Sequence, residues 1–269
     1  MTTFKKKFSE VNCLFRAGSL IQRPNFFQMP GKDNSILRAL EKGELSITGE
    51  FLWGSNYTFA VEISHAAQIL QGVYRPTQGE RPLWDFPRES LARREVAAYL
   101  VSEAFGWGFV PPTVYRGDGP IGPGSLQLYV DHDPEYNYFT FNEEDLQRLR
   151  PVALFDLLIN NADRKGSHVL FDQDRHMWLI DHGISFHRDR KLRTVIWNFA
   201  GEPITEELCS DLVNFEAQLQ PGTAFRKQLD LQLAPEEIDA LAMRTRDLLA
   251  TRQFPNPHPN RRPYPWPPV

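Results

Sequence analysis

The chain has 269 residues, of which 41% are hydrophobic, 24% charged and 12% aromatic, a composition typical of globular proteins and unlike that of disordered or fibrous ones. Its 30 lysines and arginines and 34 aspartates and glutamates give a formal net charge of −4. This charge argues against a broad nucleic-acid-binding surface, although it is compatible with local basic sites. Two cysteines, Cys13 and Cys209, are too few for a disulfide scaffold, so we expect a reducing compartment, with the cytoplasm as the default.

Membrane insertion and secretion have no support in the hydropathy pattern. No apolar run approaches the roughly 18 residues of a spanning helix, and the longest, Val152 to Ile159, is interrupted by Asp156. The basic start of the chain is not followed by the apolar region of a secretory signal. We therefore expect a soluble protein without a transmembrane segment.

The first part of the chain predicts a small β-rich lobe. Residues 1–43 form a lead-in that ends in a short helix, which Asn34 caps and Gly43 terminates. Alternating apolar residues then predict an antiparallel hairpin over 45–63 and a third extended piece over 67–76.

A helix and two more strands complete this lobe. The helix lies over 91–105, between a capping Ser90 and a terminating Gly106. Strands over 110–116 and 124–130 follow it. Residues 44–130 are thus expected to form a mostly antiparallel lobe with one helix.

The rest of the chain predicts a mainly helical lobe over 131–250. Its helical pattern over 143–161 should break at Pro151. A tight hairpin is expected over 168–181, and long helices are expected near 205–220 and 234–250. The seven prolines of residues 251–269 exclude a helix and predict an extended tail, which either packs on the body or stays free.

Polar residues gather on both sides of the expected hairpin. The sequence NNADRKGSH, residues 160–168, precedes it, and LIDHG, with Asp181, ends it. This order is that of a kinase catalytic centre, in which one Asp orients the acceptor hydroxyl and an Asp before Gly holds the bridging metal. Each segment alone is equally typical of a helix end or a β-turn. Their combination, in order and with a hairpin between them, favours the catalytic interpretation.

The blocks VYRP, GERPLWDFP, REVAAY, VPPTV, NNADRKGSHVL and LIDHG resemble those of an uncharacterised bacterial group related to phosphatidylinositol 3- and 4-kinases. The similarity to this group extends from about Leu37 to the C-terminal tail. It implies an α+β, two-lobed protein-kinase-like fold that binds ATP with Mg²⁺ or Mn²⁺ and transfers the γ-phosphoryl group. The resemblance does not indicate which molecule accepts the phosphoryl group.

The resemblance also assigns roles in the large lobe. Asp163 takes the place of the catalytic Asp, and Asp181 that of the Mg²⁺ ligand. Lys165 supplies a cation that neutralises the phosphoryl group in transfer. His168 stands where these enzymes usually have Asn, and because an imidazole suits Mn²⁺ better than Mg²⁺, the metal preference stays open. Arg164 is expected to be structural and to pair with a nearby carboxylate.

In the small lobe, a kinase fold needs a turn that covers the phosphates. Gly54, Ser55 and Asn56 form the first expected turn, whose backbone N–H groups would face the phosphates, although a plain hairpin turn explains them equally well. The spacing from Gly49 to Gly54 is only superficially that of a P-loop, because Ser55 replaces the required Lys and a strand follows.

The fold also needs a cation on the third strand and an acid that holds it. Arg75 is the expected cation, where the resemblance leads us to expect Lys, and Glu95 is the acid on the apolar stripe of the following helix. A surface ion pair of Glu95 with Arg94 or Arg88 is the alternative. Adenine would contact the backbone near Gln127 to Val130, including Tyr129, at the end of the strand that enters the hinge.

We thus predict a kinase whose acceptor is a lipid, a protein or a small molecule. The acidic net charge argues mildly against an anionic membrane substrate. Two alternatives stay open: a pseudokinase, favoured by Arg75 and His168, and a nucleotidyl transferase that adds AMP. The HRD tripeptide at 187–189 is discounted, because it follows Asp181 instead of preceding it.

Overall fold

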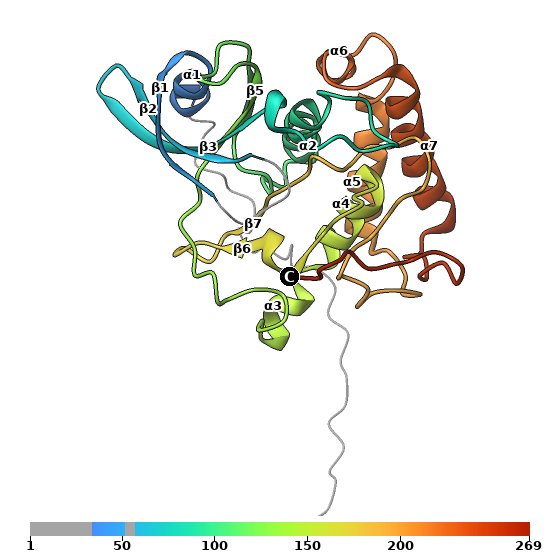
Figure 1. Cartoon of the computed structure of the whole chain (residues 1–269). Helices are drawn as coiled ribbons and strands as arrows, with labels where there is room; N and C mark the ends of the chain where they lie inside the picture. Colours follow the sequence, from blue (N-terminus) through green and yellow to red (C-terminus); the bar gives the residue numbers. More distant parts are fainter. Residues whose placement is uncertain (1–33, 52–56) are drawn as a thin grey trace, which may run out of the picture.

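The computed structural model describes residues 34–51 and 57–269. A five-stranded sheet with the strand order β1-β2-β3-β5-β4 forms one end of the molecule, at the upper left of Figure 1. All neighbouring strands are antiparallel. The strands are β1 (Glu44–Glu50), β2 (Phe59–His65), β3 (Gln68–Pro76), β4 (Thr113–Arg116) and β5 (Gly124–Leu128).

One face of this sheet carries a core of its own. Alternation along β2 turns Val61 and Ile63 inward, where they meet Tyr74 and Leu126 of the neighbouring strands. Helix α1 (Asn34–Lys42) covers this core and contributes its Leu40. The predicted hairpin and third strand are therefore present, because a period of two in apolar residues gives a strand one buried face.

Helix α2 (Leu91–Phe105) joins the sheet to the rest of the molecule, since its Ala97, Ala98 and Val101 belong to the larger core. It ends as predicted, at Gly106 with a φ of 68°. Ser90 occupies the N-cap position as predicted, but the expected capping hydrogen bond of its side chain is absent. The Ser90 hydroxyl donates to the carbonyl of Pro87 (2.7 Å) and makes no capping hydrogen bond to the helix.

The remainder is mainly helical (Figure 1). It contains α3 (Glu143–Gln147), α4 (Arg150–Ile159), α5 (Glu206–Gln218), α6 (Ala224–Asp230) and α7 (Pro235–Thr251), and the hairpin of β6 (Val169–Phe171) and β7 (Met177–Leu179). The break near Pro151 is confirmed, with this proline in the first turn of α4, where its missing N–H is not needed. The short hairpin is confirmed as well.

The described ranges thus hold seven α-helices beside an antiparallel sheet, which is the expected α+β class. The tail packs on the body: Thr194 N–H donates to the Pro263 carbonyl (3.0 Å) and Gly166 N–H to the Pro268 carbonyl (2.8 Å). Among the helices described, none is long and apolar enough to cross a membrane. The division of the chain at residues 43, 130 and 250 stays a prediction.

Candidate active site

The polar loop begins where α4 ends. Asn160 terminates this helix in the left-handed conformation (φ 54°), which Asn tolerates better than most residues. Its side-chain amide donates to the carbonyls of His187 (2.8 Å) and Asp189 (2.7 Å). The loop is therefore fixed to the segment that follows Asp181. Asp189 itself, the Asp of the HRD tripeptide, has a 72% exposed side chain, in agreement with discounting that motif.

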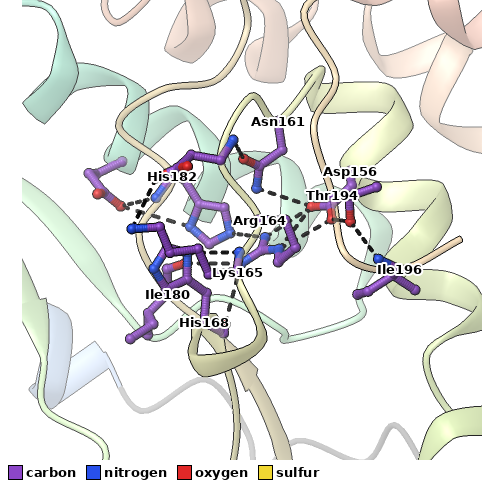
Figure 2. A network of polar contacts seen from close by, with 11 residues as sticks. Asp156, Asn161, Arg164, Lys165, His168, Ile180, His182, Thr194 and Ile196 are labelled. Carbon is purple, nitrogen blue, oxygen red and sulfur yellow. Dashed lines mark hydrogen bonds and ion pairs between the residues drawn. The ribbon is translucent and has the colours of Figure 1, made fainter. Parts of the chain in front are cut away.

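A buried ion pair holds the loop from inside. Arg164 contacts Asp156 of α4 with an N–O distance of 3.0 Å, and both side chains are 0% exposed. Asp156 also accepts hydrogen bonds from the Asn161 amide (3.1 Å) and the Thr194 hydroxyl (3.0 Å). Figure 2 shows this network. The structural role expected for Arg164 is thus explained, because a buried carboxylate and guanidinium are tolerated only when each is hydrogen-bonded.

Arg164 also connects the loop to the end of β7. It donates to the Ile180 carbonyl (3.0 Å) and contacts Nε2 of His182 at 2.8 Å (Figure 2). Because a guanidinium can only donate, Nε2 accepts and the proton of this imidazole lies on Nδ1. Burial, reinforced by the charge of Arg164, lowers the pKa of His182 well below its usual value. His182 is therefore neutral.

Glu95 of α2 binds the backbone just after Asp181. Its two carboxylate oxygens accept from the N–H groups of His182 (3.0 Å) and Gly183 (3.1 Å), and the residue is 2% exposed. The surface ion pair considered as an alternative is not formed among the described residues: Glu95 is buried, Arg94 pairs with Glu237, and Arg88 does not pair with Glu95. Burial raises the pKa of Glu95, against the charge of Arg75.

Arg75 of β3 faces the same cavity as Glu95. Its Nη1 is buried and has no hydrogen-bond partner among the described residues. Since an unpaired buried donor is costly, this atom marks a place where an anionic ligand would be stabilised.

This cavity has a volume of about 810 Å³, within the range of small-molecule sites. It brings together residues of the sheet, α2, the polar loop and the hairpin. The predicted site residues that line it are Arg75, Glu95, Gln127, Tyr129, Asp163, Lys165, His168 and Asp181. The turn at Gly54, Ser55 and Asn56 lies outside the described residues.

Two charged residues of the loop face this cavity. The Nζ of Lys165 lies 3.6 Å from a carboxylate oxygen of Asp163, and their side chains are 22% and 29% exposed. Burial raises the pKa of Asp163 to about 6, with a further contribution from Asp181, while Lys165 acts in the opposite direction. A carboxylate with this pKa accepts a proton more readily than an ordinary Asp does.

Asp181 and His168 meet across the base of the cavity, with Nε2 and Oδ2 3.4 Å apart. Burial lowers the pKa of His168 to about 4, so its ring is neutral near pH 7. Burial alone would raise the pKa of Asp181, but His168 and Arg75 hold it below its usual value. Asp181 also has a φ of 60°, a conformation that is uncommon for non-glycine residues, although Asp adopts it more readily than most.

The strand that is predicted to contact adenine is hydrogen-bonded within the protein at residues 127–129. Gln127 is 2% exposed and its amide donates to the Thr113 hydroxyl (2.9 Å). The N–H groups of Leu128 and Tyr129 bond to the carbonyls of Pro112 and Gln71. These two N–H groups of the predicted segment are therefore already bonded, and the contact of adenine with residues 127–130 stays a prediction.

The tail forms part of the cavity wall, through Trp266, Pro267 and Val269. This contribution was not foreseen, because residues near 266 are about a hundred positions from the polar loop and show only a proline-rich pattern. Gly166 lies where the tail and the loop meet. A Cβ at this position would come within 2.6 Å of the Phe139 ring.

No known protein-family model matches the sequence. The chain is 39% identical over 264 residues to the protein Rv2133c of Mycobacterium tuberculosis, an alignment that covers 85% of this chain and 93% of that protein. The chain belongs to the family of Rv2133c. A second relative, phosphatidylinositol 4-kinase gamma 4 of Oryza sativa subsp. japonica, is 29% identical over 147 residues, which is 47% of this chain and 26% of that protein.

Solved structures establish the fold of this family member. The Golgi casein kinase with Mn/ADP bound superposes with a TM-score of 0.53 at 14% identity, covering 83% of this chain and 80% of that one. The hydra Fam20 structure with sugar gives a TM-score of 0.52 at 16% identity, with 81% and 88% covered. The chain thus has a protein-kinase-like fold, as predicted.

Proposed function

We propose that this protein is an ATP-dependent phosphotransferase that acts with a divalent metal ion, Mg²⁺ or Mn²⁺. The observation that carries the proposal is the convergence of Asp163, Lys165, His168 and Asp181 on one cavity, opposite Arg75 and Glu95. These residues come from both sides of the fold and have the order along the chain that phosphoryl transfer requires. The match to a kinase solved with Mn/ADP supports the choice of nucleotide and metal.

The residues present fit a nucleotide with its metal ion. Two protein ligands, Asp181 and His168, suit an ion that takes its remaining ligands from phosphates and water, as Mg²⁺ usually does. In the described ranges, no group of three or more His, Cys, Asp or Glu residues that could hold a metal by themselves is found. The unpaired Nη1 of Arg75 fits a phosphate oxygen in the same way.

To bind a metal ion through Nε2, the neutral ring of His168 must carry its proton on Nδ1. Its Nδ1 accepts from the Lys165 N–H at 3.4 Å, so in the neutral ring Nε2 carries the proton that faces Asp181. This hydrogen bond is long and therefore weak. A cation beside Asp181 would favour the other tautomer, with the lone pair of Nε2 toward the ion.

Each of the other residues then has a defined task. Asp163 orients the acceptor hydroxyl and accepts its proton, and Lys165 offsets negative charge on the group in transfer. Glu95 fixes the backbone at 182 and 183 and thereby the position of Asp181. ATP, when bound, supplies the phosphoryl group, and the divalent ion neutralises the charge of its phosphates.

The finer placement beside phosphatidylinositol 3- and 4-kinases is part of the proposal. It is supported by the shared motifs and by the partial match to the rice 4-kinase. The acceptor stays open between a lipid, a protein and a small molecule.

A binding and turnover experiment tests the proposal. ATP with Mn²⁺ or Mg²⁺ should raise the melting temperature through mass action, and incubation should yield ADP together with a phosphorylated product or free phosphate. Asp181→Asn should abolish both effects, whereas Asp174→Asn, on the exposed turn of the same hairpin, should leave them unchanged. Release of AMP and pyrophosphate would indicate nucleotidyl transfer instead. Binding without turnover would indicate a pseudokinase, and no binding at millimolar ATP would contradict the proposal.

A further inference from the structure

A second cavity lies behind the polar loop, between the end of α4, residues 190–193, α7 and the tail. Its volume is about 620 Å³, again within the range of small-molecule sites. It shares no lining residue with the candidate active site.

The lining of this second cavity is strongly cationic. Six of its described lining residues are Arg or Lys, and one is an acid, Asp247. The cations are Arg190, Lys191, Arg193, Arg244, Arg261 and Arg262. The net charge of the whole chain is −4, so this concentration of positive charge is a local feature that the composition does not explain.

Few of these cations are neutralised within the protein. Arg190 pairs with Asp247 at 3.2 Å, but both side chains are more than half exposed, so the pair is weak. Lys191 pairs with Asp85 (2.7 Å). Four arginines of the lining remain whose guanidinium groups form no ion pair with a described residue: Arg193, Arg244, Arg261 and Arg262.

Arg244 is the residue that most needs a ligand. It is 7% exposed, and its Nε and Nη1 donate to the carbonyls of Leu158 (2.7 Å) and His187 (3.4 Å). Its Nη2 is buried and has no hydrogen-bond partner in the part of the chain that the structure describes. Of the acids on the same helix, Glu237 is engaged by Arg94 and Asp247 by Arg190.

The burial of Arg244 has an electrostatic consequence. Burial lowers its pKa to about 10, with the charge of Arg190 acting in the same direction. A buried guanidinium without a counter-ion is unfavourable, and an anion beside its free Nη2 would offset that cost.

We propose that this cavity binds a small soluble molecule that carries one or more phosphate groups. Guanidinium groups bind both carboxylates and phosphates by paired hydrogen bonds, but a phosphate group offers three terminal acceptor oxygens and more negative charge, so it can engage several arginines at once. Leu157, Leu192, Trp197 and Leu248 line the same space and provide an apolar surface for the body of the molecule.

Two lining residues connect the cavity to the polar loop: Asn160, which belongs to the loop, and Arg193, which bonds to it. Arg193 lines it, and the backbone of Arg193 bonds to the Asn161 carbonyl (2.9 Å) and the Arg164 N–H (3.0 Å). A ligand in the second cavity would therefore lie next to the candidate active site without contacting any side chain that lines that site.

Calorimetric titration with inorganic pyrophosphate tests the inference. The full chain is titrated with a chelator present, so that metal-dependent binding in the candidate active site does not contribute. The charge reversal Arg261→Glu with Arg262→Glu, on two exposed residues of the tail, should weaken binding by at least about tenfold. The matched double variant Lys227→Glu with Arg246→Glu changes the net charge equally at exposed positions outside the cavity, and it should bind within about twofold of the original chain.

Arg244→Gln provides the second arm and should also weaken binding by at least about tenfold, because it removes the unpaired donor. If this buried variant does not fold, the exposed tail variant still tests whether the cavity binds pyrophosphate. No binding in the millimolar range, or equal affinity in the tail variant and its control, would overturn the inference. Tighter binding of a poly-glutamate peptide than of pyrophosphate would overturn it too, since the cavity would then recognise a protein segment.

Discussion

The polar loop at 160–168 has two sides that differ in burial and in role, although their residues alternate along the chain. Arg164 points inward, is 0% exposed and forms an ion pair with Asp156. Its neighbours Asp163 and Lys165 face the cavity and keep 29% and 22% of their side-chain surface exposed. The inward side holds the loop in place, and the outward side presents groups to a ligand. A polar cluster in a sequence can therefore combine a structural and a chemical function at adjacent positions.

The largest effect is expected on the outward side. Asp163→Asn should reduce phosphoryl transfer by about 10²- to 10⁴-fold, because it removes the group that accepts the proton. Stability should be unchanged or higher, since a carboxyl whose pKa is raised by burial is destabilised in its charged form. Asp189→Asn, in the exposed HRD tripeptide, is the control and should have no effect on rate. Steady-state kinetics and thermal melts of both variants measure the rate of phosphoryl transfer and the stability. Equal losses of turnover and stability in Asp163→Asn would show that both sides of the loop are structural.

Substitution on the inward side should instead lower the stability of the protein. Arg164→Met leaves the Asp156 carboxylate buried without its ion-pair partner and should lower the free energy of unfolding by about 3–5 kcal/mol. Lys165→Met breaks only a partly exposed contact of 3.6 Å and should cost less than about 1 kcal/mol. Urea denaturation of the two variants compares them directly. Similar losses would mean that the difference in burial has no energetic consequence.

Arg75 extends the comparison to the far wall of the cavity. Arg75→Ala should bind ATP with Mn²⁺ at least about tenfold more weakly, because a charged donor to the phosphates is lost. Arg75→Lys should keep most of the affinity for ATP, because Lys retains the positive charge. The remaining loss reflects the planar fork of the guanidinium, which Lys lacks. Arg38→Ala, at an exposed position of α1, is the matched control. If all of these variants bind ATP equally in calorimetry, Arg75 does not contact the phosphates.

The smallest expected effect is a shift in pH dependence. Asp163 must be ionised to accept a proton, and its pKa is raised to about 6. The rate should therefore rise with pH up to about 6, level off above it, and fall about tenfold per unit below it. Lys165 lowers this pKa, so Lys165→Met should move the acidic limb to higher pH. An unmoved limb would show that a group other than Asp163 controls it.

The sequence by itself determined the local elements and the order of the catalytic candidates. The hairpins, the break before Pro151 and the end of α2 at Gly106 follow from apolar periodicity and from backbone preferences that act within a few residues. The positions of Asp163 and Asp181 around the second hairpin follow from the same local pattern. Ser90 shows the limit even at short range, because its hydroxyl bonds to the preceding turn instead of the helix.

Only the tertiary structure decided what each polar residue contacts. Glu95 bonds to the backbone at His182 and Gly183, nearly ninety positions along the chain. The tail supplies Trp266 to the wall of one cavity and Arg261 to the other. Such contacts depend on how whole elements pack, and they leave no periodic trace in the sequence. Burial, which makes His168 neutral and Arg244 short of a partner, is likewise a property of the folded chain, because it arises only when segments far apart exclude water together.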